Sequence, residues 1–306
     1  MRKVVPVFQL ASRAFANLKS NDPIRMAAAT AFFSFFALPP IVIILSQLYG
    51  NLLSDDQRVS RQLFHELAQL FGHQSARQLK DISQRLQQPQ SSTLLTILSL
   101  FLLLLASTTL FAIVKNSLNQ LWSVKTSSRR RFWYVAVDKL IALGIIIFSG
   151  FLFMTSLTIS RTLAPLNNQL FNNAVGYDWS GSIGQHLLSV VVLTIWFAVV
   201  FKYLPDIRIR WQAVWVGALV TGLLVEAGEE VLDRLLIRSP VRALYGTSGA
   251  IILVLLFVFY ASLIFYYGAS FTRYYAEWIH LDAKPSTNAV AYQIKEVERE
   301  EPKSVD

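Results

Sequence analysis

Cysteine is absent from this 306-residue sequence. The chain can therefore form neither a disulfide framework nor a thiolate metal site, and the redox compartment stays open. Histidine is scarce as well, and no HxH or HExxH spacing that would hold a metal occurs among His65, His73, His186 and His280. No serine stands in a G-x-S-x-G elbow, and no glycine-rich phosphate loop with its lysine is found. We therefore expect no metal and no other cofactor, and enzymatic chemistry is disfavoured.

Charge is the second scarcity. Charged residues make up 15% of the chain, against roughly 25% in soluble domains, whereas hydrophobic residues make up 54%. A helix needs about 20 mostly apolar residues to cross a hydrocarbon core roughly 30 Å thick. Five uncharged runs reach that length, and a sixth run from Trp211 meets Glu226 after 15 residues. The sequence predicts an all-α membrane bundle of six transmembrane helices over residues 27–49, 92–114, 138–160, 183–203, 211–232 and 249–272.

Three further segments flank or interrupt this membrane domain of residues 27–272. Residues 1–26 fit an in-plane interfacial helix and a helix packed on the bundle equally well, because one helical stripe holds Val4, Val7, Phe8, Ala11, Phe15 and Leu18. Residues 55–88 predict an external cap of two amphipathic helices that break near Gly72-His73. Residues 273–306 predict a cytoplasmic tail with a disordered acidic end.

Lysine and arginine are distributed unevenly between the predicted loops. With six spans and the N-terminus inside, fifteen of them lie in cytoplasmic segments and nine in the longer external ones. The positive-inside rule therefore predicts that both termini are cytoplasmic. The net charge of +9 does not indicate nucleic acid, since the basic residues cluster beside the spans. We expect membrane lipids, and not nucleic acid, as partners.

The first predicted span contains two consecutive prolines. Pro39 and Pro40 lack backbone donors and clash with the preceding turn, so the helix should kink or break there. Ser34 and Thr30 can satisfy part of the freed backbone, and a break must face protein or a cavity. One interpretation is a discontinuous helix at a substrate site. The commoner alternative is a kink needed only for packing.

The fifth predicted span combines small residues with carboxylates. Ala218, Gly222 and Glu226 are spaced by four, and Glu229 and Glu230 follow, so a close helix contact should lead into an acidic cluster. Carboxylates inside a membrane commonly mark an ion, proton or substrate path. The alternative is structural pairing near the outer headgroups, with Arg234, Arg238 or Arg242 as partners.

A glycine-bounded turn precedes the last predicted span. It reads Tyr245-Gly246-Thr247-Ser248-Gly249, and its two glycines suit a tight re-entry into the membrane with close backbone approach.

Several separated motifs together resemble the YihY/BrkB family of bacterial inner-membrane proteins. They are Ala27 to Pro39, Leu118-Asn119-Gln120-Leu121-Trp122, Tyr203-Leu204-Pro205 with Arg208, Gly217-Ala218 with Glu226, and Tyr245 to Ala250 running into Gly268-Ala269. The resemblance implies six membrane helices and an unsettled activity. Members have been labelled ribonuclease BN, and others have been connected with serum resistance and with export of small solutes. One departure is that many members have Gly-Ala-Glu where Ser270 follows Gly268-Ala269 here.

The leading functional hypothesis is a transporter or exporter of a small solute or lipid-like molecule. Its cavity would be framed by Ser34 with Pro39 and Pro40, by Gly222 and Glu226, and by the turn at Tyr245–Gly249. A second hypothesis is an envelope or scaffold protein that does not transport, and a third is a membrane-embedded enzyme acting on lipid. A homo-oligomer stays open, because the Ala218 and Gly222 stripe suits contacts within or between protomers.

Overall fold

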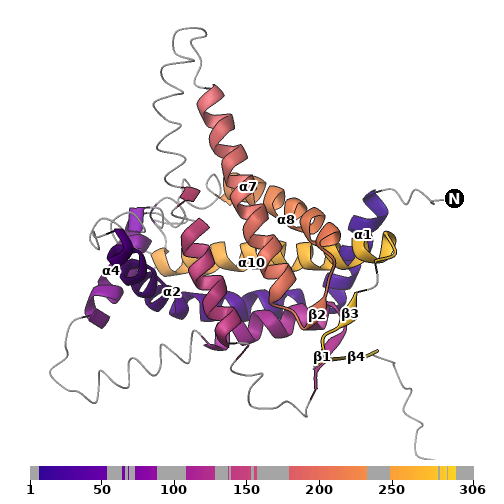
Figure 1. Ribbon diagram of the computed structural model, residues 1–306. Coiled ribbons are helices and arrows are strands. Elements are labelled where there is room, and N and C mark those ends of the chain that lie inside the picture. The colour runs from indigo at the N-terminus through magenta and orange to yellow at the C-terminus, as the bar shows by residue number, and fades with distance from the viewer. Residues whose placement is uncertain are drawn as a thin grey trace, which may run out of the picture.

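The computed structural model describes residues 7–53, 64–65, 68, 73–87, 108–127, 137, 139–152, 155–156, 179–232, 249–281, 283–287 and 289–293. Helices dominate these residues and pack around α10 (Gly249–Trp278), which runs through the middle of the bundle (Figure 1). Four short strands gather at one end, which we call the strand end. The opposite end carries α4 (His73–Gln87), and we call it the far end.

The chain enters the bundle at the strand end through two helices. The first helix, α1 (Val7–Ser20), is followed by α2 (Pro23–Leu53). Asp22 adopts a left-handed conformation with φ 53° and accepts a hydrogen bond from the Met26 amide at 3.2 Å. Pro23 occupies the first helical position, where its missing N–H costs nothing. This sharp junction turns the chain from α1 into the bundle.

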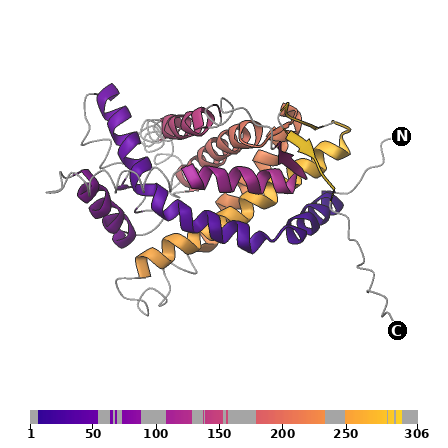
Figure 2. The same cartoon turned by 90° about the horizontal axis from the view of Figure 1, so that it is seen from below.

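The second helix passes through both prolines without a break. α2 is one helix from Pro23 to Leu53, and Figure 2 shows it changing direction along its length. The predicted kink is therefore present, whereas the discontinuous helix at Pro39 and Pro40 is a wrong expectation. Membrane helices tolerate proline because local adjustment and neighbouring groups take up the freed carbonyls.

Two further long helices, α7 (Trp179–Tyr203) and α8 (Trp211–Leu232), come from the second half of the sequence. They run in opposite directions and pack against each other, and α8 also packs against α10. Residues 108–121 and Lys139–Leu152 are helical as well. Buried side chains from these elements form one core that includes Leu118, Leu121, Phe197, Phe201, Val214, Phe265 and Tyr266.

Within the described ranges, three helices are long and apolar enough to cross a membrane: His186–Tyr203, Trp211–Glu229 and Ile251–Trp278. They match the last three predicted spans. Pro23–Pro39 and Lys139–Leu152 are shorter apolar helices, and most of the predicted span 92–114 lies outside the described residues. The six-span count therefore stays a prediction.

The outer surface of the bundle is rich in large apolar side chains. Soluble proteins rarely expose large contiguous patches of such side chains to water. The apolar outer surface of this bundle is therefore suited to contact with the hydrocarbon of a membrane. On the Lys139–Leu152 helix they form one stripe, and further examples lie on α2, α7, α8 and α10: Leu140, Leu143, Ile147, Phe151, Phe32, Phe36, Leu187, Val191, Leu219, Leu223, Ile251 and Leu256.

Packing also decides the orientation of α1. Leu10, Ala14 and Leu18 are buried, and the first two pack with Phe271 of α10. Phe8 and Phe15 on the other face are 82% and 60% exposed. The helix thus packs on the bundle, as one of the two sequence interpretations stated, and keeps an apolar face outside.

Short strands at the strand end were not predicted. β1 (Val124–Thr126) pairs antiparallel with β4 (Ala289–Ala291), and β2 (Ile207–Arg208) pairs with β3 (Lys284–Pro285). An all-α description is therefore incomplete. Two- and three-residue strands carry too little periodicity to be recognised from a sequence. The segment after α10 is described as far as residue 293, and the predicted disordered end lies outside the described residues.

The closest helix contact joins α8 and α10 through two matching Gly-x-x-x-Thr sequences. A Cβ on Gly217 would lie 1.8 Å from Thr272 Oγ1, and a Cβ on Gly268 would lie 1.8 Å from Thr221 Oγ1. Each threonine donates to its own helix, Thr221 to the Gly217 carbonyl at 2.7 Å and Thr272 to the Gly268 carbonyl at 2.8 Å. Small residues let the backbones approach, and the hydroxyls need no partner across the contact.

Replacing Gly217 with alanine should therefore destabilise the protein. The new methyl group would also lie 3.2 Å from the Thr272 Cα, so rotating the threonine side chain cannot relieve the clash. We expect a loss of about 1–3 kcal/mol, typical of overpacking. The measurement is the midpoint of unfolding of the purified protein by SDS in mixed micelles, followed by circular dichroism.

Gly144→Ala is the matched control, because a Cβ there has nothing within 4 Å. It should be neutral or slightly stabilising, since alanine is the better helix former. Equal midpoints for Gly217→Ala and Gly144→Ala would contradict the close contact.

Candidate functional site

Glu226 is the centre of a polar cluster near the far end of α7 and α8. Its Oε1 lies 2.6 Å from His186 Nδ1, and its Oε2 accepts a hydrogen bond from Ser189 Oγ at 2.5 Å. The Glu226 side chain is 17% exposed and that of His186 is 60% exposed. Both carboxylate oxygens are therefore engaged by α7, in a segment that is otherwise apolar.

The backbone of α8 positions this carboxylate. A Cβ on Gly222 would lie 3.0 Å from Thr194 Oγ1 and 3.4 Å from the Val190 carbonyl oxygen, so α7 and α8 approach closely there. Glu226 lies one helical turn after Gly222 on the same face of α8, so it also faces α7. Counting 1.5 Å per residue from Trp211, it lies roughly 22 Å along the helix. The predicted close contact at Gly222 is confirmed.

The remaining predicted site residues do not all join this cluster. Ser34 is half-buried and Pro39 is buried on α2, which packs on α10 and α4, whereas the Gly222 and Glu226 face is directed at α7. The single cavity expected between these two faces stays a prediction. Glu229 is half-buried on α8, and Gly249 begins α10. Outside the described residues lie the side chains of Pro40 and Glu230, together with Tyr245 and Gly246.

A second polar cluster lies at the strand end around Asp206. Its Oδ1 lies 2.8 Å from Lys115 Nζ, and each of the two side chains is 12% exposed. Its Oδ2 accepts hydrogen bonds from Thr126 Oγ1 at 2.8 Å and Asn119 Nδ2 at 3.0 Å. The Asn119 side chain also accepts from the Asp206 amide at 2.8 Å. The cluster joins helix 108–121, β1 and the link between α7 and α8.

Two effects compete in setting the pKa of Asp206. Desolvation by burial raises it, but the hydrogen bond and charge of Lys115, with the hydrogen bonds from Thr126 and Asn119, outweigh that effect, so the pKa is lowered below its ordinary value of 3.8. Asp206 is therefore ionised in the folded protein. Its ion pair and hydrogen bonds join three segments at the strand end.

Breaking this pair on one side should be costly. Asp206→Asn leaves the Lys115 ammonium buried without a counter-charge, so we expect a loss of about 3 kcal/mol in the free energy of unfolding. Adding Lys115→Met should recover part of the loss. The control is Asp22→Asn, whose partner Arg25 forms a pair with side chains 73% and 65% exposed, and which should change stability by less than about 0.5 kcal/mol. Additive losses in the double variant would contradict a coupled pair.

The same pair should make stability depend on acid. Because the folded pKa of Asp206 is below 3.8, the pair contributes fully above that pH and is lost as the pH falls through the folded pKa. The stability difference between wild type and Asp206→Asn should therefore be constant at higher pH and shrink below about pH 4. The measurement is SDS unfolding of both proteins between pH 6 and pH 3, and a difference that persists unchanged at pH 3 would refute the assignment.

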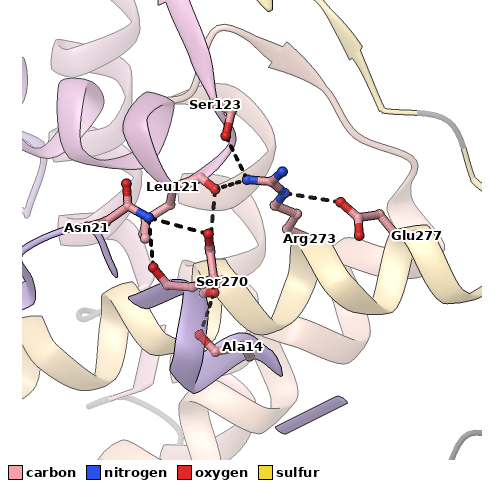
Figure 3. Close-up of polar contacts among 8 residues, drawn as sticks. Ala14, Asn21, Leu121, Ser123, Ser270, Arg273 and Glu277 are labelled. Atoms are coloured by element: carbon pink, nitrogen blue, oxygen red, sulfur yellow. Dashed lines mark hydrogen bonds and ion pairs between the residues drawn. The ribbon is translucent and has the colours of Figure 1, made fainter. Parts of the chain in front are cut away.

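A third polar cluster connects α1, helix 108–121 and α10 (Figure 3). Ser270 is fully buried, donates to the Ala14 carbonyl at 2.8 Å and accepts from Asn17 Nδ2 at 2.9 Å. Arg273 Nη1 donates to the Leu121 carbonyl at 2.5 Å and to Ser123 Oγ at 3.0 Å, and its Nε donates to Glu277 Oε1 at 3.1 Å. These contacts cap the end of helix 108–121 with charge.

Sequence reasoning missed the partners in all three clusters. In the sequence, His186 enters only the search for metal-ligand spacing, and Lys115 enters only the count of basic residues in the cytoplasmic segments. A usable signal was present, since Lys115 stands one turn before the motif residue Asn119 and Asp206 directly follows Pro205. Lys115 and Asp206 have opposite charges, and each lies beside a family motif on the same predicted side of the membrane. An ion pair between them could therefore have been predicted from the sequence.

These observations together define a multi-pass helical membrane protein with its polar clusters near the helix ends. Residues 14–293 match the sequence profile of the family described as Virulence factor BrkB, and the chain belongs to that family.

Two curated relatives, each named UPF0761 membrane protein, are similar to this chain. The relative from Chromohalobacter salexigens is 25% identical over 267 residues, which cover 84% of this chain and 61% of the relative. The relative from Teredinibacter turnerae is 21% identical over 280 residues, which cover 89% and 61%. The chain thus spans about three fifths of the length of these relatives. Their names state no enzymatic activity, and no solved structure matches the chain.

Proposed function

We propose that this protein is a transporter or exporter of a small solute or lipid-like molecule in a bacterial inner membrane. The observation that carries the proposal is Glu226, a carboxylate in the apolar segment Trp211–Glu229 that is held by Ser189 and His186 of the neighbouring helix. Placing a carboxylate among apolar helices is costly, and such groups commonly line ion, proton or substrate paths. His186 is the first residue of the apolar segment His186–Tyr203 and its side chain is 60% exposed, so the cluster lies at one end of that segment.

The orientation belongs to the same proposal. The strand end carries several basic residues on its helices, strands and links, among them Lys115, Lys125, Lys202, Arg208, Arg210 and Arg273. By the positive-inside rule this end faces the cytoplasm, together with α1 and the segment after α10. The Glu226 cluster would then open towards the outside.

An envelope or scaffold protein that does not transport is the second candidate. It is favoured by the complete engagement of the Glu226 carboxylate, since a group with both oxygens bonded to its neighbours also serves to fasten two helices. Water access to the interior separates the two functions, because a transport path must be wet and a scaffold can be sealed. An enzymatic role has no comparable support in the clusters described above.

Single cysteines in this cysteine-free chain provide the test. Ser189→Cys and Ser34→Cys report the Glu226 cluster and the interior of α2, and Lys125→Cys reports the exposed strand end. We expect a membrane-impermeant maleimide to label Ser189→Cys in intact cells and Lys125→Cys only in inside-out vesicles. Labelling of Ser34→Cys in either preparation would mean that water reaches deep into the bundle, as a transporter requires.

Leu223→Cys is the control for background, because this 51% exposed position on α8 faces hydrocarbon and a thiolate does not form there. Reaction of Ser189→Cys and Ser34→Cys at no more than the Leu223→Cys rate would exclude the transport path and favour the scaffold. Reaction of Lys125→Cys in intact cells would reverse the orientation.

A further inference from the structure

A cavity of 520 Å³ opens at the strand end, between the last turns of α10 and the segment that returns to form β3. Its volume is in the range of small-molecule sites. Apolar side chains, including Trp122 and Leu281, form part of the wall. Among the residues that the structure describes, the polar part of the wall includes Arg273, Glu277, His280 and Lys284.

The chain reversal that builds this cavity is a well-defined helix end. His280 is in the left-handed conformation with φ 53°, its amide donates to the Glu277 carbonyl at 3.1 Å, and the Leu281 amide donates to the Ala276 carbonyl at 2.9 Å. This is the Schellman arrangement, in which glycine is the usual residue at the left-handed position. A histidine there places an imidazole on the cavity wall. The two bonds also occupy terminal carbonyls that would otherwise repel an anion.

Among the described residues of this wall, three carry basic groups and one, Glu277, carries an acidic group. The contacts of Arg273 use Nε and Nη1, and within the described part of the chain Nη2 has no partner. Glu277 balances one positive charge, with its side chain 55% exposed. Lys284 is exposed on β3, and His280 is exposed beside it. The wall thus keeps an excess of positive charge and N–H donors, the chemistry that binds a phosphate group.

The depth of the cavity places it at headgroup level. The apolar helix Ile251–Trp278 has 28 residues and is therefore about 42 Å long, longer than a hydrocarbon core of roughly 30 Å. The helix is thus long enough for its last turns, which carry the charged side chains of Arg273 and Glu277, to extend beyond the hydrocarbon. Tyr203, Trp211 and Trp215 at the same end are 52%, 40% and 46% exposed, as expected of aromatic side chains at a membrane interface.

We propose that this cavity is a binding site for a phosphate-bearing anion, with Arg273 Nη2, His280 and Lys284 on the phosphate and Trp122 and Leu281 on the apolar part of the ligand. Either the headgroup of an anionic phospholipid or a soluble phosphate compound presents this chemistry. The site does not depend on the transport proposal, because it involves neither Glu226 nor the far end.

Two probes distinguish the sources. Phosphatidylglycerol, compared with phosphatidylcholine, is added to the full-length protein in neutral detergent and its binding is measured by native mass spectrometry. Binding of radiolabelled inorganic phosphate is measured by equilibrium dialysis. We expect saturable binding of phosphatidylglycerol, with a Kd raised about tenfold by His280→Gly and by Lys284→Gln, as loss of a charge-assisted contact predicts. Saturable binding of inorganic phosphate with the same dependence on both variants would support the site and assign it to soluble ligands.

The variants are chosen to leave folding intact, so that a change in the measured Kd reports loss of a ligand contact and not unfolding. Glycine is the preferred residue at the left-handed position of His280, so His280→Gly keeps the chain reversal, and its SDS unfolding midpoint should match wild type or exceed it. Lys125→Gln removes an equal charge from an exposed position of β1 outside the cavity. The proposal is overturned if neither probe binds saturably, or if Lys125→Gln weakens binding as much as Lys284→Gln does.

Discussion

The close approach of α8 and α10 is the contact on which the arrangement of the bundle depends. Lipid is as apolar as the helices, so burial of apolar surface gives little reason for membrane helices to associate, and close packing has to supply it. Gly217 and Gly268 permit that packing, and each is matched by a threonine of the other helix. With α8 fixed on one side, α10 has its other faces available for α1, α2 and α4.

Polar groups are then found where the helices end. At the strand end Asp206, Arg273 and Ser270 connect four chain segments that are far apart in sequence, through buried or half-buried hydrogen bonds. The short strand pairs add backbone bonds between the same segments, such as the Tyr292 amide to the Ser123 carbonyl at 2.9 Å. A rigid strand end contrasts with the Glu226 cluster, which consists of three side chains on two helices.

The sequence was sufficient for features that depend on composition over many residues. The spans at α7, α8 and α10 follow from uncharged runs long enough to cross a bilayer, and the contact at Gly222 follows from a small-residue stripe. Features that depend on two distant residues were missed. Gly217 and Thr272 show their relation only when both helices are placed, and the Lys115 pair with Asp206 joins residues in different loops. For Pro39 and Pro40 the sequence left a kink and a break open, with the kink the commoner outcome, and the continuous helix α2 agrees with the kink.

Ser270 stands where the family resemblance of the sequence leads us to expect a glutamate after Gly268-Ala269. The position is fully buried between α1 and α10, and its side chain both donates to a carbonyl and accepts from an amide. A hydroxyl can do both, whereas an ionised carboxylate cannot donate and would face the Ala14 carbonyl with like charge. The local structure therefore requires a neutral residue at 270. A mechanism that needs an acidic group in the membrane domain must place it elsewhere, and Glu226 is a carboxylate that α7 holds by direct hydrogen bonds from both His186 and Ser189.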